Sequence, residues 1–209
     1  MRIKKRIIEA SHLLIKIGHN IGSEGNISYR VGDRVYITPS GIKTSNLNIK
    51  NISELDLDGN ILNKIKPSSE FLLHLLIYKN FKNVNSVVHS HSTWASIISC
   101  TRMNIPSFHY MIAEFGGDDI KCAKYATFGT KELSKNVNTA LNNRKGCLIA
   151  NHGQITLGEN LEESIDLSIA MEKICKQYYY GLLTNKLKIL NKKQMLKVIE
   201  SFKDYKPKR

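Results

Sequence analysis

The chain has 209 residues, of which 42% are hydrophobic, enough for one domain with a substantial core. Its formal net charge is +13, which suits either nucleic acid or a small anionic substrate. No apolar run is long enough to span a bilayer, and no recognition-helix or aromatic RNA-binding pattern occurs. The basic N-terminus lacks the continuous apolar core of a secretory signal. We therefore expect a cytoplasmic protein without a membrane or nucleic-acid partner.

The four cysteines are scattered, and no two of them form a C-x-x-C pair. This spacing argues against a disulfide framework and against a thiolate zinc site. We therefore expect free thiols, most of them buried, at Cys100, Cys122, Cys147 and Cys175.

The first elements predicted along the chain are a helix and a β-hairpin. Apolar residues recur with helical spacing over residues 3–17, and Gly18 is suited to end that helix. Residues 27–31 and 34–38 alternate as strands, with Gly32-Asp33 as the tight turn between them. The chain therefore enters its sheet through this hairpin.

Two glycine-containing loops flank the hairpin, at residues 22–26 and 39–41. The hairpin can bring them together, and backbone N–H groups in such loops bind anions well. Local sequence alone favours simple turns at both places. A second hairpin is expected between residues 55–57 and 60–62, with Asp58-Gly59 as its turn.

A helix is expected over residues 71–78, directly after a short polar segment. Ser68 and Ser69 are available to cap its free N–H groups. A helix N-terminus with two hydroxyls also suits a phosphate group. For Glu70 in the first turn, local sequence favours a simpler explanation, since a carboxylate there complements the helix dipole.

The second half of the chain alternates strands and helices. Thr130 is a suitable cap for one of its helices, and the apolar face of the longest helix is expected to carry Leu161, Ile165, Ile169 and Ile174. The predicted strands are 85–91, 146–150 and 154–158, and the predicted helices are 94–100, 131–143, 161–183 and a piece around 195–202.

Three histidines stand at the ends of predicted strands. His89 and His91 are two residues apart, so a strand turns both to the same side. His152 ends another apolar run and is followed by Gly153. Three imidazoles in such surroundings suggest a catalytic zinc with an open coordination position. An H-x-H pair alone is a weak signal, and His109 is a rival third ligand without the strand-end glycine.

Taken together, these pieces resemble the class II aldolase/adducin family from the first helix to the tail. Two of the stretches that carry the resemblance are specific to the branch acting on L-fuculose 1-phosphate, namely residues 105–112 and 125–130. The stretches shared with the whole family are Gly25-Asn26-Ile27-Ser28, residues 37–42, Pro67-Ser68-Ser69-Glu70, residues 87–91 and Asn151-His152-Gly153.

The resemblance implies an α/β fold: one domain over residues 1–209, with a central, mainly antiparallel β-sheet flanked by helices. Residues 185–209 would form a helical, basic tail. It further implies a homotetramer with four-fold cyclic symmetry and active sites at the subunit interfaces.

The resemblance also implies one Zn²⁺ per subunit. Its ligands would be His89, His91 and His152, and Glu70 would serve both as a carboxylate near the zinc and as the catalytic base. Tyr110 would reach into the active site of the neighbouring subunit.

The remaining implied site residues bind the substrate or close over it. Tyr205 in the tail would help to close the site, and Phe128 would line the aldehyde side. The residues implied around the substrate phosphate are Asn26, Ser40, Gly41, Ser68 and Ser69.

The activity implied is the reversible cleavage of L-fuculose 1-phosphate, a phosphorylated ketose, to dihydroxyacetone phosphate and L-lactaldehyde through an enediolate. Related enzymes act on 5-deoxyribulose 1-phosphate, on ribulose phosphates as 4-epimerases, or on methylthioribulose phosphate as dehydratases. Adducin-type relatives are interaction modules without the metal. Two departures are visible: Asn151 stands where near relatives carry a histidine, and residues 206–209 form a different, basic tail end.

Overall fold

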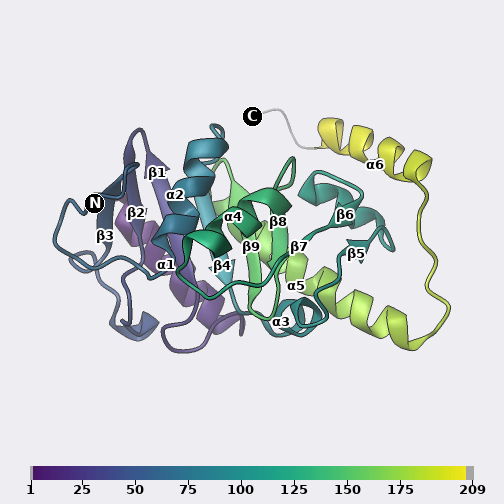
Figure 1. Ribbon diagram of the computed structural model, residues 1–209, viewed down its shortest axis with the longest axis horizontal. Helices are drawn as coiled ribbons and strands as arrows, with labels where there is room; N and C mark the ends of the chain where they lie inside the picture. Colours follow the sequence, from purple (N-terminus) through teal and green to yellow (C-terminus); the bar gives the residue numbers. More distant parts are fainter. Residues whose placement is uncertain (1, 206–209) are drawn as a thin grey trace.

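The computed structural model describes residues 2–205, with side chains described as far as Phe202, and that part is built around a seven-stranded β-sheet (Figure 1). The strands are β1 (Asn26–Val31), β2 (Arg34–Ile37), β3 (Ser53–Asp56), β4 (Ser86–Ser90), β7 (Cys122–Ala123), β8 (Gly146–Ile149) and β9 (Gly153–Gly158). They lie in the order β3-β2-β1-β4-β9-β8-β7, and of these described pairs only β7–β8 is parallel. The predicted, mainly antiparallel sheet is therefore confirmed.

Helices cover both faces of this sheet. In Figure 1 α2 and α4 lie together in front of the strands, whereas α1 and α5 run behind them. A short two-stranded sheet of β5 and β6 lies beside the main one, next to η2 and α6. The helical elements are α1 (Arg2–Lys16), η1 (Thr44–Asn46), α2 (Phe71–Asn80), α3 (Thr93–Ser99), η2 (Tyr110–Phe115), α4 (Lys131–Ala140), α5 (Leu161–Leu183) and α6 (Lys192–Tyr205), and the small strands are β5 (Ile105–Pro106) and β6 (Asp119–Ile120).

The two faces of the sheet bury different hydrophobic clusters, and this separation decides where the polar strand residues point. On β4, Val87 packs in one cluster with Leu73 of α2, whereas Val88 packs in the other with Ile7 of α1. Side chains alternate along a strand, so His89 shares the face of Val87. The histidine is thereby turned toward the layer formed by α2.

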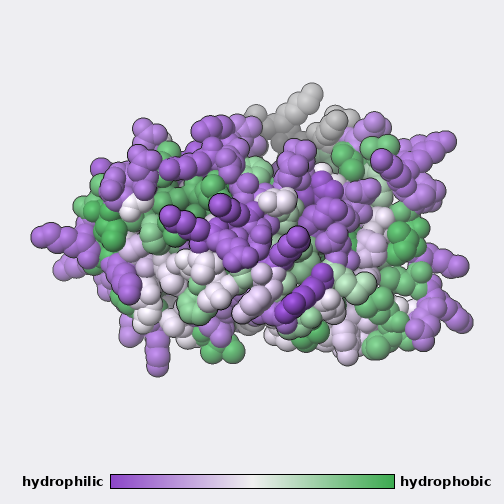
Figure 2. Space-filling view, in the orientation of Figure 1, coloured by the Kyte–Doolittle hydropathy of each residue, from purple (hydrophilic) through white to green (hydrophobic). Residues whose placement is uncertain are grey.

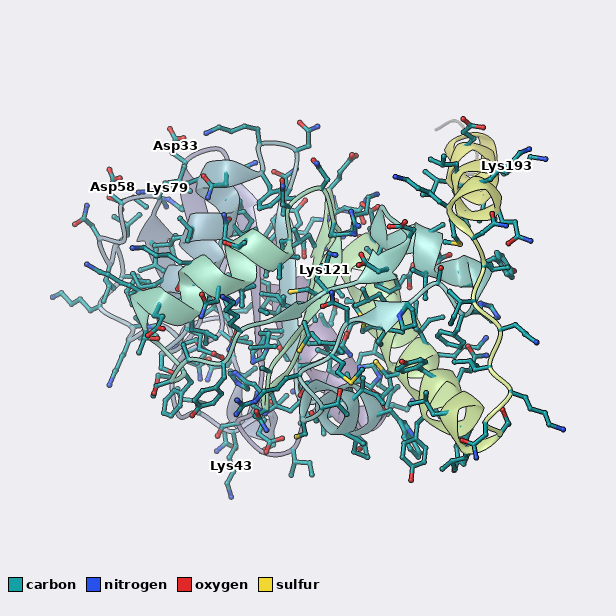
Figure 3. The ribbon with its side chains drawn as sticks, turned by 45° about the vertical axis from the view of Figure 1, so that its right-hand side comes forward. Asp33, Lys43, Asp58, Lys79, Lys121 and Lys193 are labelled. Carbon is teal, nitrogen blue, oxygen red and sulfur yellow. The ribbon has the colours of Figure 1, made fainter. Side chains whose placement is uncertain are left out.

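Charged side chains are dispersed over the surface. Figure 2 shows hydrophilic side chains across the whole of one face, with hydrophobic ones between them. In Figure 3, Lys43, Lys121 and Lys193 come from separate parts of the chain, and Lys79 lies beside Asp58, to which it is ion-paired at 3.1 Å. Among the described residues, no helix is both long and apolar enough to cross a bilayer.

Most predicted elements occur within one or two residues of their expected bounds, and the second hairpin forms only in part. Its first arm is β3, which pairs with β2, and residues 60–62 contribute only the isolated bridge Leu55↔Ile61. The chain reverses at Asp58-Gly59, and two backbone bonds join the arms, from the N–H of Asp56 to Asn60 at 3.1 Å and from the N–H of Leu62 to Glu54 at 2.8 Å. The Asp56 carboxylate accepts the backbone N–H groups of Asp58 and Asn60 at 3.0 and 2.8 Å.

The helix starts were predicted with mixed success. Thr130 caps α4, since its hydroxyl accepts the N–H of Leu133 at 3.2 Å. The predicted serine cap of α2 was wrong, because the N-cap position is Glu70 and makes no side-chain cap bond. Ser68 instead accepts the N–H of Glu70 at 3.3 Å, one residue before the helix.

The long helix α5 has the predicted bounds, but its buried face differs by one position. Ile169, expected on the apolar face, is 40% exposed, and Met171 and Cys175 are fully buried instead. All four cysteines carry free thiols, as predicted: Cys147 and Cys175 are buried, Cys122 is partly buried and Cys100 is exposed.

The loop between α1 and β1 is fastened to the end of β4. The Asn20 Oδ1 accepts the backbone N–H of His91 at 3.0 Å. At Gly25, φ is +65°, and a Cβ atom there would lie 2.7 Å from the His89 carbonyl oxygen and 2.4 Å from the Asn20 side chain. Gly22 has the same φ, but a Cβ there would meet nothing within 4 Å. Only at Gly25 does close packing add to the cost of the backbone conformation.

This contrast predicts different stabilities for two matched variants. Gly22→Ala should lower the free energy of unfolding by about 1 kcal/mol, the cost of a left-handed alanine. Gly25→Ala should lose at least about 2 kcal/mol more, because the added methyl group clashes with the backbone of β4. Urea unfolding of both variants measures the difference. Equal losses would show that the close approach to His89 carries no energetic weight.

Candidate metal centre and active site

Three imidazoles meet at one end of the sheet. His89 lies on β4, His91 follows that strand, and His152 lies in the turn between β8 and β9. The three ring centroids are 4.7–4.9 Å apart, and the Nε2 atoms of His89 and His91 are 3.1 Å apart. Antiparallel pairing of β4 with β9, and of β9 with β8, brings the distant His152 to the first two histidines.

The donor set fits a divalent metal ion. One ligand atom from each of the three histidines lies within 4.8 Å of the others. Tetrahedral zinc with Zn–N bonds of 2.0–2.1 Å separates its nitrogen ligands by about 3.3 Å, close to the spacing of His89 and His91. Burial and the neighbouring His89 lower the pKa of His91 to about 3 and that of His152 to about 4. Both imidazoles are therefore neutral at pH 7, as metal ligands must be.

His89 is held in one orientation by its second ring nitrogen. Its Nδ1 lies 2.8 Å from the Gln154 carbonyl oxygen on β9, and the ring is fully buried. A carbonyl oxygen only accepts, so Nδ1 carries a proton and Nε2 is the atom that faces the other two histidines and Glu70. Nε2 becomes a ligand atom when its own proton is displaced by a metal ion. Near His91, a carboxylate oxygen of Glu24 lies 3.9 Å from Nδ1.

Glu70 places a buried carboxylate against this cluster. It stands immediately before α2 and is 5% exposed; Oε2 lies 3.2 Å from His89 Nε2, and Oε1 lies 3.8 Å from His152 Nε2. Among the described residues, Oε1 has no hydrogen-bond partner. A buried acceptor of this kind calls for a ligand, which supports the fit to a metal or to a substrate proton.

The Glu70 carboxyl is ionised in these surroundings. Burial raises its pKa, but the charge on His89 and hydrogen bonds from His89 and Asn26 outweigh burial and hold that pKa well below its ordinary value. The Asn26 amide donates to Oε2 at 2.9 Å. An ionised carboxylate in this position is able to accept a proton.

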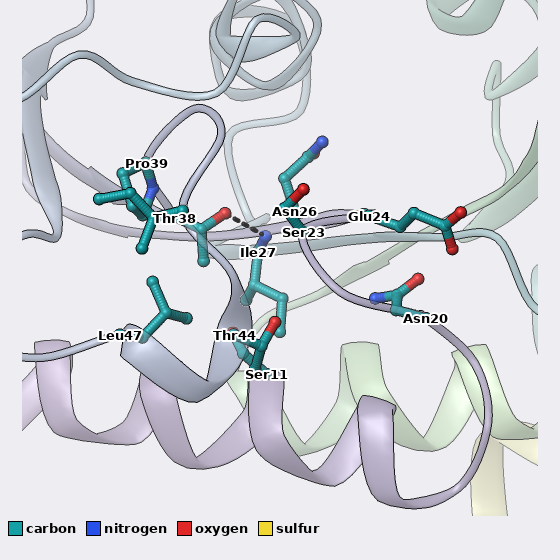
Figure 4. Close-up of a pocket in the computed structure, with 12 residues that line it drawn as sticks. Ser11, Asn20, Ser23, Glu24, Asn26, Ile27, Thr38, Pro39, Thr44 and Leu47 are labelled. Carbon is teal, nitrogen blue, oxygen red and sulfur yellow. Dashed lines mark hydrogen bonds between the residues drawn. The ribbon is translucent and has the colours of Figure 1, made fainter.

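The segments expected to bind phosphate run side by side. An isolated bridge joins Pro39 to Pro67, with the N–H of Ser40 donating to Lys66 and the N–H of Ser68 donating to Thr38. Figure 4 shows Asn26, Thr38 and Pro39 around one pocket, where the Thr38 hydroxyl accepts the N–H of Ile27. At Gly41, φ is +71° and nothing lies within 4 Å of a Cβ position. Ser68 is buried, whereas Ser69 and Gly41 are exposed.

Phe128 lies in a loop that packs on the start of α2. A Cβ atom at Gly129 would lie 3.0 Å from the Ser69 carbonyl oxygen, so the loop backbone closely approaches this serine. The Phe128 side chain is 65% exposed. It is therefore free to contact a substrate or a second subunit.

Tyr110 is not brought to the histidine cluster within one chain. Its side chain is 51% exposed, and among the described residues its ring stacks on His109 and on Phe202 of α6. Tyr205 ends α6, and its side chain lies outside the part of the chain that the structure describes. The roles of both tyrosines therefore stay predictions.

Two other sequence expectations are settled by position. His109 lies outside the three-histidine cluster and caps η2, accepting the N–H of Met111 at 3.2 Å, so His152 is the third member. Asn151 adopts φ +54°, and its Oδ1 accepts a hydrogen bond from Arg102 at 2.7 Å. Asparagine tolerates this left-handed conformation, which forms the turn that presents His152.

Sequence reasoning missed several polar residues around the site. His74 and Ser28 are fully buried behind Asn26, and Gln154 and Glu24 approach the histidines. One signal was available: Glu70 and His74 are four residues apart, so they share a helix face. The contact with Gln154 is made by a backbone carbonyl, which no side-chain pattern reveals.

Comparison with known proteins agrees with this geometry. The model of the Class II Aldolase and Adducin N-terminal domain matches residues 5–179. The chain is 38% identical to the 5-methylthioribulose-1-phosphate/5-deoxyribulose-1-phosphate aldolase of Rhodospirillum rubrum, covering 97% of this chain and 92% of that protein. It is 37% identical to the L-fuculose phosphate aldolase of Escherichia coli, covering 98% and 95%. A solved L-fuculose 1-phosphate aldolase superposes with a TM-score of 0.93 at 32% identity, covering 97% and 96%. The chain therefore belongs to the class II aldolase/adducin family.

Proposed function

We propose that this protein is a zinc-dependent aldolase that reversibly cleaves L-fuculose 1-phosphate to dihydroxyacetone phosphate and L-lactaldehyde. The observation that carries the proposal is the meeting of three imidazoles with the buried, ionised carboxylate of Glu70. His89, His91 and His152 would hold the metal, with Glu70 beside it. When bound, a divalent cation supplies Lewis-acid stabilisation for negative charge that develops on the ketone oxygen.

Glu70 is the proposed base. In the direction of synthesis, it removes a proton from the carbon beside the ketone of dihydroxyacetone phosphate, and that carbon then attacks the aldehyde. Tyr110 of a neighbouring subunit gives a proton to the aldehyde oxygen, and cleavage is the reverse of these steps. The burial of Glu70 and His89 keeps water from the reacting carbon.

We propose that the protein positions its substrate through the phosphate group. Asn26, Ser40, Gly41, Ser68 and Ser69 would hold it, at the point where the two neighbouring loop segments meet. Binding energy from this remote group then orients the bond that reacts. Such a site recognises a phosphorylated ketose and leaves the choice of aldehyde to other residues.

Two other ketose phosphates should also be tested as substrates. The Rhodospirillum rubrum relative is an aldolase for 5-methylthioribulose 1-phosphate and 5-deoxyribulose 1-phosphate. These two ketoses have the same phosphorylated end as L-fuculose 1-phosphate, and only the aldehyde product of their cleavage differs. Phe128, exposed beside Ser69, is the proposed residue on that side. The same metal and phosphate residues therefore serve either reaction.

Release of dihydroxyacetone phosphate tests the proposed reaction. We expect release from L-fuculose 1-phosphate or 5-deoxyribulose 1-phosphate that falls by about 10³-fold on chelation, since a Lewis acid contributes several kcal/mol, and returns with Zn²⁺. His152→Ala should lose both zinc and activity. His12→Ala, an exposed histidine on α1, is the matched control and should keep both. No release from any phosphoketose by the zinc-loaded protein would refute the proposal.

Substitution of the proposed base separates proton transfer from metal binding. Glu70→Gln keeps the size of the side chain and should lower kcat by roughly 10²–10⁴-fold, the usual contribution of a positioned base. Zinc content and the affinity for inorganic phosphate should change far less. A variant that retains more than about a tenth of wild-type kcat would remove Glu70 from the base role.

Mixed oligomers test the sharing of Tyr110 between subunits. Tyr110→Phe and Glu70→Gln should each be nearly inactive alone. When the two variants are unfolded, mixed and refolded together, a subunit with intact Glu70 can lie beside one with intact Tyr110, and part of the activity should return. If the mixture is no more active than its components, Tyr110 acts within its own chain or not at all.

A further inference from the structure

A buried line of polar side chains runs from Glu70 into the layer between β1 and α2. His74 Nε2 lies 2.5 Å from the Asn26 Oδ1, and the Ser28 hydroxyl lies 2.7 Å from His74 Nδ1. The Tyr78 hydroxyl follows, 2.6 Å from that of Ser28. Asn26 is 5% exposed, and the other three are fully buried.

The secondary structure explains why these side chains meet. Asn26 and Ser28 are two residues apart on β1 and share the face toward α2, while Glu70, His74 and Tyr78 follow each other at intervals of four. The polar row of the strand therefore lies against the polar row of the helix. Hydrophobic residues of the same cluster surround them.

The direction of every hydrogen bond in this line follows from its first member. An ionised carboxylate only accepts, so the Asn26 amide nitrogen faces Glu70 and its oxygen faces His74. His74 then donates from Nε2. Burial lowers the pKa of His74 to about 3, so the ring is neutral and its Nδ1 accepts from Ser28. The Ser28 oxygen in turn accepts from Tyr78.

We propose that His74 is a positioning residue for catalysis, which acts through Asn26 to hold the Glu70 carboxylate in its reactive orientation; this inference rests on the proposed aldolase function. Without the His74 donor, the Asn26 amide is free to rotate and to turn its oxygen toward Glu70. Two acceptors would then face each other, and Glu70 would move away from the reacting proton. A displacement of the carboxylate by about 1 Å from the reacting proton is sufficient to slow proton transfer.

Substitutions of His74 and Asn26, alone and together, test this coupling. His74→Leu should lower kcat by about 10–100-fold and change KM by less than about threefold, with zinc content unchanged. His74→Gln keeps a donor near the position of Nε2 and should recover most of the loss. In an Asn26→Ala background, His74→Leu should cause no further loss of kcat. Independent, multiplying losses would overturn the proposal, because they would show that His74 does not act through Asn26.

A second pair of variants guards against a failure of His74→Leu to fold. Ser28 and Ser86 are both fully buried, and each makes a short bond to another buried side chain, Ser86 to Ser164 at 2.6 Å. Ser28→Ala should lower kcat, whereas Ser86→Ala should cost similar stability and leave kcat unchanged. Equal kcat for the two variants would contradict a catalytic effect of the line.

A measurement that needs no enzymatic activity tests the hydrogen-bonded line if the aldolase proposal fails. If the wild-type protein cleaves no phosphoketose, the direction of the line is read from ¹⁵N–¹H spectra of its histidine side chains. His74 should show a single neutral form with the proton on Nε2 from pH 5.5 to 8.5. A proton on Nδ1, or titration of His74 in that range, would overturn the inference whatever the substrate.

Discussion

The antiparallel pairing of β1 with β4 is the constraint on which the site depends. It sets Asn26 directly opposite His89. A slip of β1 by one residue would turn Asn26 to the opposite face of the sheet, away from His89. Ile27 and Val88 oppose each other next in the register, and both pack with α1. The hydrophobic contacts behind the sheet thus fix the strand register, and the register fixes the positions of the polar residues in front of the sheet.

The local charge at the site has a different origin from the net charge of the chain. Lysines and arginines are spread along the chain, whereas the site combines the buried carboxylate of Glu70 with His91 and His152, whose pKa values are lowered. Burial lowers the pKa values of His91 and His152, whereas at Glu70 the neighbouring His89 and Asn26 outweigh it. A metal ion meets ready ligands there, and Glu70 remains available as a base.

Periodicity made part of this site predictable. Alternation along a strand placed His89 and His91 on one side, and the Asp–Gly and Gly–Asp turns marked real reversals of the chain. The third histidine was different, since its approach depends on the pairing of β4, β9 and β8, which no local pattern encodes. His152 was chosen over His109 for its strand-end glycine, and its role came from the resemblance of the whole chain to a family.

The misses share a physical cause. Residues 60–62 had strand-like sequence, but they make a single bridge to β3, and the Asp56 carboxylate binds two backbone N–H groups of the turn. His74 looked like one more residue of an apolar helix, because its partners on β1 are far away in sequence. In both places a side-chain contact decided the outcome, and such contacts are visible only once the elements have been brought together.

The docking of α6 on η2 has a consequence for the order in which the chain is completed. The segment that carries Tyr110 is covered by Met195 and Phe202, and Ser107 bonds to Leu190 on the way to that helix. At synthesis rates of 5–20 residues per second, η2 leaves the ribosome roughly 4–15 s before the helix that covers it. Each newly made chain therefore exposes the apolar surface around Tyr110 to solvent for some seconds.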